Sequence, residues 1–402
     1  MAITDKEKGV WLLDEVYAKQ NEGDIWSYDA AYEVWVWGRN TVGSLGVNKG
    51  GNGTPMSRSS PTQLPGTDWT TPIITGGNDG EQNAALKTGG AIWNWGHNES
   101  GEMGQNSTNN GYSSPVRVGG ATDGWVGGFS GGNQSLMAKT DGTLWVWGGN
   151  GHGVFGLNNN TSYSSPKQVG TDTTWSGASG KVAVSGNTAV TAIKTDGSMW
   201  VWGRDDEGGE VGDANNVSRS SPVQVDGSWT KCARGKNHGL AINAAGEIWS
   251  WGRNNSGQLG LSNNSHYSWP QKIGTDTDWA DCGASNSSSF GLKTDGTLYS
   301  WGSGSGGVTG RNGTGNINYP LQIPGTNWAK ICRGGNNCYG AIKSDGTMWV
   351  WGNDEYGQMA NNDGDIDRSS PTQIGTESTW RQVQGNQFDM VGGVKDDGTL
   401  WM

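Results

Sequence analysis

The chain of 402 residues contains only four cysteines, four histidines and four phenylalanines. The cysteines form no CxxC pair and no cysteine–histidine cluster with the spacing of a zinc site. The phosphate-binding loop that ends in Gly-Lys-Ser/Thr is missing as well. We find no group of side chains typical of catalysis, and therefore expect a protein with no enzymatic activity and no cofactor.

The sequence also has fewer basic than acidic residues, and it has no long apolar stretch. Asp and Glu total 38 against 27 Lys and Arg, which gives a formal net charge of -11. Proteins that neutralise nucleic-acid phosphates concentrate Lys and Arg on one face, so we expect no nucleic-acid partner. No apolar run approaches the roughly 20 residues of a membrane-spanning helix, so we expect no membrane insertion. The N-terminus lacks the apolar stretch of a signal peptide, which argues against export.

Glycine and tryptophan, in contrast, are abundant, with 71 Gly and 24 Trp. This pairing fits many tight turns separated by short aromatic strands. The decamer KTDGTLWVWG at 139–148 returns as KTDGSMWVWG at 194–203 and as KSDGTMWVWG at 343–352. Its Trp-x-Trp-Gly element recurs along the whole chain, with Tyr299 replacing one Trp, and an incomplete copy, DGTLWM, ends the sequence. A period of roughly 50 residues indicates a propeller or a solenoid.

The order of residues within each repeat unit predicts four short strands. An Asp-Gly pair between two strands is a strong signal for a two-residue hairpin turn, because both residues tolerate positive φ. A single Trp opens each unit, at Trp69, Trp125, Trp175, Trp229, Trp279, Trp328 and Trp380. A Pro-led segment closes each unit, at Pro61, Pro115, Pro166, Pro222, Pro270, Pro320 and Pro371. Four antiparallel strands per unit form a propeller blade. We therefore predict an all-β fold, a seven-bladed β-propeller over residues 31–402 with a short extension at residues 1–30.

The tryptophans and the chain ends give two further expectations. Trp at alternate strand positions points to one side of the sheet, so we expect these rings to pack between neighbouring blades. Closing the ring removes exposed edges, so the N-terminal strand should complete a blade with strands from the C-terminus. The Trp-x-Trp element has one copy more than the seven blades need, and the sequence leaves open whether Trp35 or Trp401 supplies the closing strand.

Several motifs connect the chain to a known family. They are WGRNNSGQLG at 251–260, the Pro-led segment that follows it, CARGKNHGLAI at 232–242, and the Asp-Gly before each Trp-x-Trp-Gly. On these motifs, residues 30–402 resemble the RCC1-like family of seven-bladed propellers. The resemblance implies the fold and leaves function open, because that family includes a nucleotide-exchange factor on chromatin, ubiquitin-ligase and ciliary modules and a bacterial enzyme inhibitor. Nucleotide exchange has no support here beyond the fold.

The polar loops contain the candidate ligand-binding residues. The Gly- and Asn-rich loops vary in length and should emerge on one rim, where they suit recognition of proteins or glycans or form a solvated surface. Aromatic residues expected near this rim are Tyr112, Tyr163, Tyr267 and Trp269. The histidines, His97, His152, His238 and His266, are expected to be exposed loop residues.

Two acidic stretches are possible cation sites. Asp363, Asp365 and Asp367 alternate in DGDID, a spacing that can surround calcium, although the stretch lacks the Gly and the distal Glu of a helix-loop-helix site. A solvated loop is the alternative explanation, and we expect the same of DDEGGEVGD at 205–213.

Residues 1–30 lie outside the repeat. Val10, Leu13, Val16 and Tyr17 have helical spacing, which predicts a short helix. The stretch containing Val10, Trp11, Leu13, Tyr17 and, after a polar span, Trp26 also resembles a short segment of tailed-bacteriophage virion proteins. This resemblance implies an attachment element, formed by Val10, Trp11, Leu13, Val16, Tyr17 and Trp26, that contacts other virion proteins.

Two functional hypotheses follow. The first is a non-enzymatic bacteriophage virion component, such as a tail appendage, fibre or decoration protein, whose propeller binds a host protein or surface glycan. The alternative is a cytoplasmic RCC1-like adaptor or inhibitor that binds one cellular partner protein on the propeller.

Overall fold

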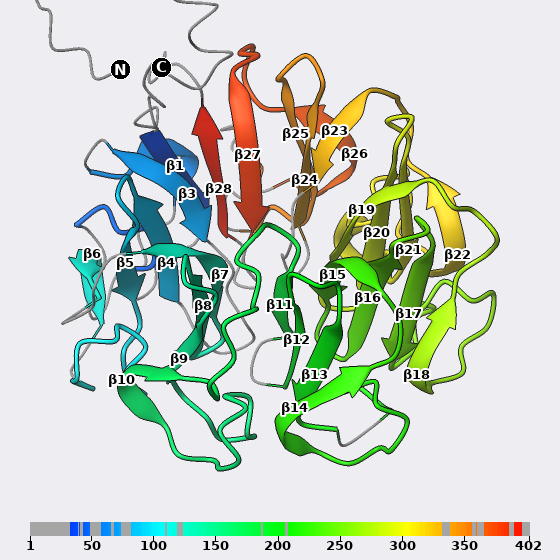
Figure 1. Ribbon diagram of the computed structural model, residues 1–402. Helices are drawn as coiled ribbons and strands as arrows, with labels where there is room; N and C mark the ends of the chain where they lie inside the picture. The colour runs from blue at the N-terminus through cyan, green and yellow to red at the C-terminus, as the bar shows by residue number, and fades with distance from the viewer. Residues whose placement is uncertain are drawn as a thin grey trace, which may run out of the picture.

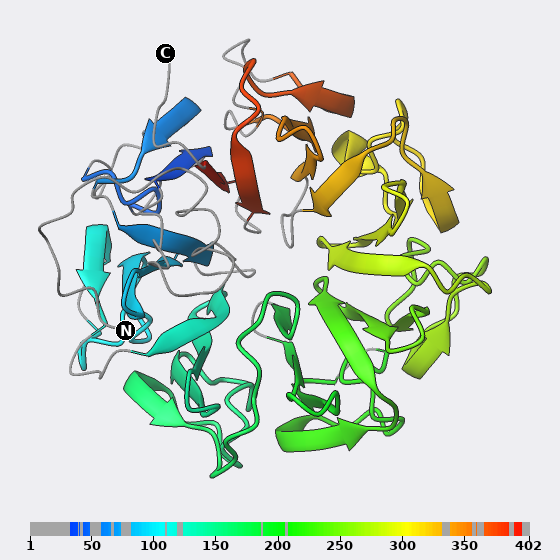
Figure 2. The same ribbon diagram turned by 45° about the horizontal axis from the view of Figure 1, so that its top comes forward.

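A computed structural model shows a ring of small antiparallel sheets around a central axis (Figures 1 and 2). The structure describes residues 33–395 except 39, 41–42, 49–57, 66–67, 74–81, 109–110, 119–123, 186–187, 206–207, 332–337, 356–358, 360–365 and 386–389. Every sheet in these residues has four strands. The predicted all-β propeller is therefore confirmed.

Six blades are built from four consecutive strands each, listed here by strand order. They are β3 (Trp69–Ile73), β4 (Gln82–Lys87), β5 (Ala91–Gly96) and β6 (Tyr112–Arg117); β7 (Trp125–Gly131), β8 (Gln134–Lys139), β9 (Leu144–Gly148) and β10 (Tyr163–Gln168); β11 (Val182–Ser185), β12 (Ala189–Ile193), β13 (Met199–Gly203) and β14 (Arg219–Val225). The other three are β15 (Trp229–Arg234), β16 (His238–Asn243), β17 (Ile248–Gly252) and β18 (Tyr267–Lys272); β19 (Trp279–Ala284), β20 (Ser288–Lys293), β21 (Leu298–Gly302) and β22 (Ile317–Gln322); β23 (Trp328–Ile331), β24 (Cys338–Lys343), β25 (Met348–Gly352) and β26 (Arg368–Gln373). A one-turn 3-10 helix, η1 (Ser305–Gly307), lies between β21 and β22.

A composite sheet from both ends of the chain closes the ring. Its strands are β2 (Arg58–Gln63), β1 (Glu33–Gly38), β28 (Met390–Lys395) and β27 (Trp380–Gly385), in that order across the sheet. Trp35 of β1 pairs with Gly393 of β28, which confirms that the N-terminal strand completes a blade with C-terminal strands. The count of seven is reached only when this composite sheet is included with the six contiguous blades. Trp401 lies outside the described residues.

The ring has two distinct faces. The connections between the third and fourth strands, such as residues 149–162 and 253–266, lie on one face beside the short connections between the first and second strands. Backbone hydrogen bonds join the two kinds of connection, as from Arg253 N to the Asn237 carbonyl at 2.8 Å. The Asp-Gly turns lie at the opposite ends of the strands. We call these the loop face and the turn face.

The predicted packing of tryptophan between blades is confirmed. The second Trp of the Trp-x-Trp element is fully buried in every described blade and, in all of them except blade β15–β18, packs edge-on against the Trp that opens the same blade. Its indole N–H reaches the preceding blade, as from Trp301 Nε1 to the Gln258 carbonyl at 2.9 Å and from Trp351 Nε1 to the Val308 carbonyl at 2.7 Å. The same bond is made by Trp95, Trp147 and Trp202, so these five indoles connect two blades through both apolar contact and a hydrogen bond.

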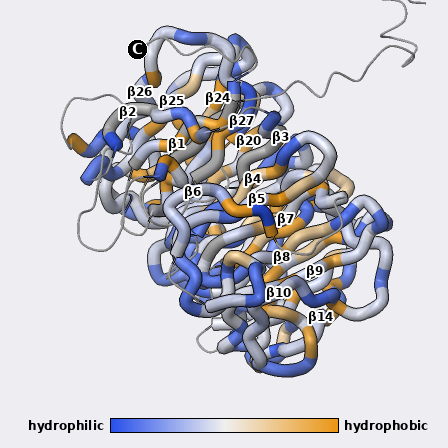
Figure 3. The backbone as a smooth tube through the Cα atoms, turned by 90° about the vertical axis from the view of Figure 1, so that its left-hand side faces the viewer, coloured by the Kyte–Doolittle hydropathy of each residue, from blue (hydrophilic) through white to orange (hydrophobic). Residues whose placement is uncertain are grey.

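The outer strands carry features that discourage pairing with another chain. Each outer strand contains the Pro of the Pro-led segment, for example Pro270 in β18, and its register is interrupted by a bulge. Proline and bulges both disfavour addition of a further strand at an exposed edge. Figure 3 shows the hydrophobic segments concentrated in the strands and the hydrophilic ones mostly in the connecting loops. No helix within the described residues has the length and apolar character needed to cross a bilayer.

The Asp-Gly hairpin includes a chain of side-chain hydrogen bonds. Asp141 Oδ1 accepts from both the backbone N–H and the hydroxyl of Thr143, at 3.0 and 2.6 Å. Thr143 Oγ1 in turn accepts from Trp145 Nε1 at 2.8 Å. These bonds hold the Asp141 carboxylate and depress its pKa. The same arrangement recurs at Asp345, Thr347 and Trp349, so the turn sequence also orients the first Trp of the next strand.

Replacing Thr143 with valine should therefore destabilise the protein by about 1–2 kcal/mol, because a partly buried indole N–H loses its acceptor while the side-chain volume is kept. Urea denaturation of wild type and Thr143→Val would measure the difference. Thr161→Val is the matched control, since Thr161 is exposed and its backbone carbonyl and N–H make the hydrogen bonds to Asn150 and Asn159. Equal effects of the two substitutions would contradict this role for the Thr143 hydroxyl.

Candidate functional site

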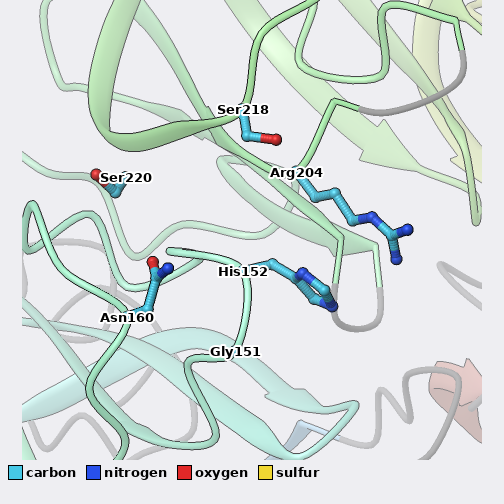
Figure 4. A pocket seen from close by; sticks show the side chains of 6 residues that line it. All are labelled: Gly151, His152, Asn160, Arg204, Ser218 and Ser220. Atoms are coloured by element: carbon cyan, nitrogen blue, oxygen red, sulfur yellow. The ribbon is translucent and has the colours of Figure 1, made fainter.

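A polar hollow opens between blade β7–β10 and blade β11–β14, at the loop face. Its volume is about 310 Å³, and it is lined by Gly151, His152, Asn160, Arg204, Ser218 and Ser220. The first three belong to the loop between β9 and β10, and the others come from the loop and outer strand of the neighbouring blade. Figure 4 shows the side chains of His152 and Arg204 extending in the same direction, away from Asn160 and Ser220. We call this feature the seam hollow.

A small residue at one repeat position creates the seam hollow. Ser218 Oγ accepts a hydrogen bond from Asp205 N at 3.1 Å, and His266 Nδ1 accepts the equivalent bond from Asn254 N at 2.9 Å in the next blade. There the imidazole fills the space, because a Cβ on Gly208 would lie 3.4 Å from the His266 ring. Ser218 is much smaller than His266, so the equivalent volume at the seam hollow is open.

The walls of the seam hollow are fixed by tight packing between the two blades. Asn158 N donates to the Ser220 carbonyl at 2.7 Å, which joins one loop to the neighbouring outer strand. Gly153 has φ of 72°, and a Cβ there would lie 2.8 Å from the Ser220 Cβ, so this close approach requires glycine. The seam hollow is therefore a preformed feature of the interface between blades.

A buried polar cluster lies between blades β11–β14 and β15–β18, beginning one residue beyond Arg204. Asp205 Oδ1 accepts from Glu210 N at 3.0 Å, while Asp205 Oδ2 is buried without a hydrogen-bond partner. Burial, together with the nearby Glu210 carboxyl, raises the pKa of Asp205 to about 7. The expectation that 205–213 is a solvated acidic loop is wrong for Asp205 and Glu210, which both lie in the interior.

Arg234 and His238 complete this cluster from strands β15 and β16. Arg234 Nη1 donates to Thr191 Oγ1 at 3.0 Å and its Nη2 donates to the Glu210 carbonyl. The Glu210 carbonyl occupies the repeat position whose equivalents accept an indole N–H from the next blade. Because Arg234 donates to it here, the indole N–H of Trp251 has no partner. Desolvation lowers the pKa of Arg234 to about 10 despite the neighbouring carboxylates.

His238 is fully buried, so its predicted placement in an exposed loop is wrong. Ser289 Oγ donates to the Gln258 carbonyl at 2.7 Å, so His238 Nε2, 2.9 Å from Ser289 Oγ, must be the protonated donor nitrogen. Burial, together with the Arg234 charge, lowers the pKa of His238 to about 3. His238 is therefore a neutral structural residue between blades β15–β18 and β19–β22.

The other histidines divide by burial. His152 and His266 are exposed, as predicted. His97 is half-buried beside Glu102, and its Nδ1 lies 3.4 Å from Glu102 Oε1. This carboxylate raises the pKa of His97. The prediction of an exposed side chain is therefore wrong for His97.

The aromatic candidates, expected near the loop rim, lie in outer strands, at or close to the strand end that follows a loop-face connection. Tyr112 opens β6 and Tyr163 opens β10, while Tyr267 and Trp269 both belong to β18. Their place in a strand follows from the repeat, because each directly precedes the Pro of the outer strand or begins that strand. Trp269 is 57% exposed, and Tyr319 occupies the same position in β22 at 47% exposed.

The acidic calcium candidate is only partly within the described residues. Asp363 and Asp365 lie outside them. Asp367 Oδ1 accepts from Asp354 N at 2.9 Å, the bond that Ser218 and His266 make in their blades. Asp367 thus has a structural role at a repeat position. Within the described residues, no group of three or more His, Cys, Asp or Glu side chains is arranged to hold a metal ion.

The predicted attachment residues cannot be compared with the fold. Val10, Trp11, Leu13, Val16, Tyr17 and Trp26 all lie outside the described residues. The attachment role of this segment stays a prediction.

Comparisons with known proteins agree with the observed fold. The RCC1-like domain profile matches residues 33–391. Human probable E3 ubiquitin-protein ligase HERC4 is 25% identical over 203 residues, covering 50% of this chain and 18% of HERC4. The ultraviolet-B receptor UVR8 of Arabidopsis thaliana is 24% identical over 276 residues, covering 65% of this chain and 60% of UVR8. The chain spans less than two thirds of the length of either relative.

Two solved structures resemble the propeller as a whole. Yeast RCC1 (Prp20), solved with Kap60, gives a TM-score of 0.76 at 18% identity and covers 91% of this chain and 89% of its own. Human WBSCR16 gives a TM-score of 0.74 at 17% identity, covering 91% of this chain and 99% of its own. At this identity the likeness shows the fold alone. Since the family profile extends over most of the sequence and the strands follow the same plan, the chain belongs to the RCC1-like domain family.

Proposed function

We propose that this chain is a non-enzymatic protein-binding module that recognises a partner protein through its loop face. The observation that carries the proposal is the seam hollow, a preformed polar recess on the face where the variable loops gather. A rigid scaffold that displays loops of different length suits specific recognition. This proposal corresponds to the second of the two functional hypotheses, an RCC1-like adaptor or inhibitor, and adds that the loop face is the surface that contacts the partner.

Relatives of the same fold support protein binding. Yeast RCC1 (Prp20) was solved bound to Kap60, and a second structure of Prp20 concerns its binding to Gsp1p and histones. HERC4 is named as a ubiquitin-protein ligase and UVR8 as a receptor. We propose that this chain shares the general role of holding another protein, with no catalytic group of its own. A cytoplasmic location is part of the same proposal.

Site-specific photo-crosslinking tests which face is used. A photo-reactive residue at Asn264, an exposed position of a loop-face connection, should crosslink a partner from native lysate. The same residue at Thr275 is the matched control, because that connection lies on the turn face, where the Thr277 carbonyl approaches Gly246 of the Ala245-Gly246 turn. A partner crosslinked only from Asn264, and then shown to bind the purified chain, supports the proposal. Capture from Thr275 alone would assign binding to the turn face and overturn it.

The virion hypothesis rests on residues 1–30, and none of the comparisons supports it. It remains a prediction with a direct test. Mass spectrometry of purified, intact phage particles would detect the chain if it is a virion component, whereas its absence would exclude a tail, fibre or decoration role.

A further inference from the structure

We propose that the turn face of blade β15–β18 has a binding site for the primary ammonium group of a small amine, formed by the paired rings of Trp229 and Trp249. This inference is independent of the proposed function, because it concerns the opposite face and a different class of ligand. Its support comes from a lysine that recurs in the other blades, from the residue that replaces it here, and from ring geometry that is kept.

The recurring lysine lies over two aromatic rings of its own blade. Lys194 Nζ is 4.8 Å from the ring centroid of Trp175 and 4.2 Å from that of Trp200. An ammonium within about 6 Å of a ring centroid is attracted by the negative face of the ring. Lys87, Lys139, Lys293 and Lys343 lie over two rings in the same way, and Lys395 lies over Trp380 in the closing sheet. The aromatic pair of the repeat therefore binds an ammonium group.

Blade β15–β18 keeps the rings and replaces the lysine. Trp229 and Trp249 meet edge to face with ring centroids 6.1 Å apart and an interplanar angle of 81°. The equivalent pair in blade β23–β26 has values of 6.2 Å and 82°. Asn243 is the register partner of Trp229, in the position that Lys343 occupies in β24. The ring geometry that holds the chain's own ammonium in other blades is therefore present here beside an asparagine.

The side chain of Asn243 is bound to the hairpin turn. Its Oδ1 accepts from Ala245 N and from Glu247 N, both at 3.0 Å. Its Nδ2 donates to Glu247 Oε2 at 2.6 Å. Asn243 thus takes the role that the Asp of the Asp-Gly turn has in other blades, and its amide is directed to the turn.

Two lysines lie near the aromatic pair without covering it. Lys272 Nζ donates to Glu247 Oε1 at 2.6 Å, and Lys181 Nζ donates to the Trp229 carbonyl at 3.4 Å. Both ammonium groups therefore have acceptors other than the two rings. Trp249 is half-buried, so its ring borders solvent at the turn face.

A carboxylate explains why the ligand should be a primary ammonium. Lys194 Nζ, besides its contact with the rings, lies 2.8 Å from Asp172 in the connection that precedes Trp175. In blade β15–β18 the connection before Trp229 contains Asp226, which is exposed and whose backbone carbonyl accepts from Trp229 Nε1 at 3.2 Å. A primary ammonium can donate a hydrogen bond to this carboxylate while it lies against the rings, whereas a quaternary ammonium has no N–H to donate.

Fluorine NMR of the full chain labelled with 5-fluorotryptophan tests the site, with n-butylammonium as a probe that reproduces the end of a lysine side chain. The Trp249 signal, assigned through Trp249→Phe, should shift and saturate as the probe is added. The signals of Trp200 and Trp349 should not, because lysines of the chain lie over these rings. The absence of a saturable shift at Trp249 would overturn the site.

Two further probes define the chemistry of the ligand. Neutral n-butanol should bind at least about tenfold more weakly than n-butylammonium, because it lacks the charge that the rings attract. Tetramethylammonium should also bind more weakly, because it cannot donate to Asp226. Equal binding of n-butanol would show an apolar site and overturn the proposal, and tighter binding of tetramethylammonium would overturn the assignment to a primary ammonium.

Asn243→Lys tests whether the missing lysine is what leaves the rings open to a ligand. The substitution supplies an ammonium from the chain itself, so it should weaken binding of n-butylammonium at Trp249 at least about tenfold. Asn264→Lys is the matched control, because it adds the same charge at an exposed position of the loop face and should change binding less than twofold. Equal binding by Asn243→Lys and the wild type would overturn the proposal.

Lys343→Asn is the reverse experiment, and it keeps the proposal testable if Asn243→Lys fails to fold. Removing Lys343 takes away the ammonium that lies 5.0 Å from the Trp328 centroid and 4.1 Å from that of Trp349. The Trp349 signal of this variant should then shift and saturate with n-butylammonium, as the Trp249 signal does in the wild type. A Trp349 signal that stays unchanged would contradict the view that the aromatic pair binds an ammonium from solution.

Discussion

Trp301→Ala should lower the free energy of unfolding by about 4 kcal/mol, the range observed when a large buried aromatic side chain is truncated. Trp301 is fully buried and packs against Trp279 with ring centroids 6.3 Å apart. The substitution also removes the hydrogen bond from Trp301 Nε1 to the Gln258 carbonyl of the preceding blade. Gly260 lies against the indole, so no neighbouring side chain on that side can move in to fill the cavity.

Urea denaturation at pH 7, followed by circular dichroism, would measure this loss. Trp269→Ala is the control of the same chemistry, because Trp269 is 57% exposed, and it should change stability by less than about 0.5 kcal/mol. A loss for Trp301→Ala as small as that of Trp269→Ala would show that the packing between blades contributes little to stability.

A second pair of variants isolates the hydrogen bond within this contact. Trp301→Phe removes an indole N–H that has an acceptor, whereas Trp251→Phe removes one that lacks a partner because Arg234 donates to the Glu210 carbonyl in its place. Both rings are fully buried, so the loss of ring volume is matched. Trp301→Phe should therefore be the more destabilising by about 1 kcal/mol.

The architecture could be predicted from the sequence because the same sequence elements recur from blade to blade. Asp-Gly turns, alternating tryptophans and the Pro-led segment each have a local physical meaning, and their order fixes four strands per unit. The closing sheet was also predictable, since Trp35 belongs to a strand whose unit is otherwise incomplete. That Tyr163 and Trp269 belong to outer strands could not be predicted, because the repeat alone does not show where a loop ends and an outer strand begins.

The seam hollow and the buried cluster were missed for a different reason. Asp and Glu are mostly exposed in proteins, so a loop rich in both was interpreted as solvated. A comparison of repeat positions would have given the signal, because Asp205 stands where other blades have Asn98, Asn150 and Asn254. The hollow itself depends on the difference in size between Ser218 and His266. The sequence does not show that these two residues are equivalent, because their equivalence follows from the same hydrogen bond that each accepts from a backbone N–H.

Asp205→Asn should stabilise the protein at pH 8 by about 2 kcal/mol, since a buried carboxylate oxygen without a donor is replaced by an amide that can donate. In the equivalent position, Asn150 Nδ2 donates to the carbonyls of Asn159 and Thr161 at 3.0 and 3.1 Å. Asp205 Oδ1 keeps the acceptor half of this arrangement, and asparagine would keep it too. The gain therefore comes from Oδ2, which asparagine replaces with an amide nitrogen.

The pH dependence of this gain follows from the raised pKa of Asp205, which is about 7 in the folded protein against 3.8 in the unfolded chain. Below pH 3.8 both states hold the proton, and the folded form keeps its full stability. As the pH rises from about 4 to 7, the folded protein must give up a proton that it holds more tightly than the unfolded chain, so wild type loses stability. The advantage of Asp205→Asn should grow across this window and level off above pH 7.

His238 has the opposite effect on stability, because its pKa is lowered to about 3 in the folded protein. The unfolded chain takes up a proton as the pH falls below about 6.5, and wild type loses stability in that direction. This contribution is common to wild type and Asp205→Asn, so it cancels in the difference between their unfolding free energies. Measurements at pH 4.5, 6 and 8 would therefore report Asp205 together with its interaction with the Glu210 carboxyl, and a difference that does not change with pH would contradict the raised pKa of Asp205.

Asn254→Asp offers the mirror-image experiment in the neighbouring blade. Asn254 Nδ2 donates to the Asn263 and Ser265 carbonyls at 2.9 and 3.0 Å, so aspartate there would place a carboxylate oxygen against two acceptors. We expect a loss of about 2 kcal/mol or more at pH 8 and a smaller loss at pH 4.5, where the new carboxyl is protonated more often and can donate. If Asp205→Asn raises the free energy of unfolding and Asn254→Asp lowers it, and both effects grow with pH, then this repeat position favours an amide in both blades. The carboxyl group of Asp205 would then be a destabilising exception at that position.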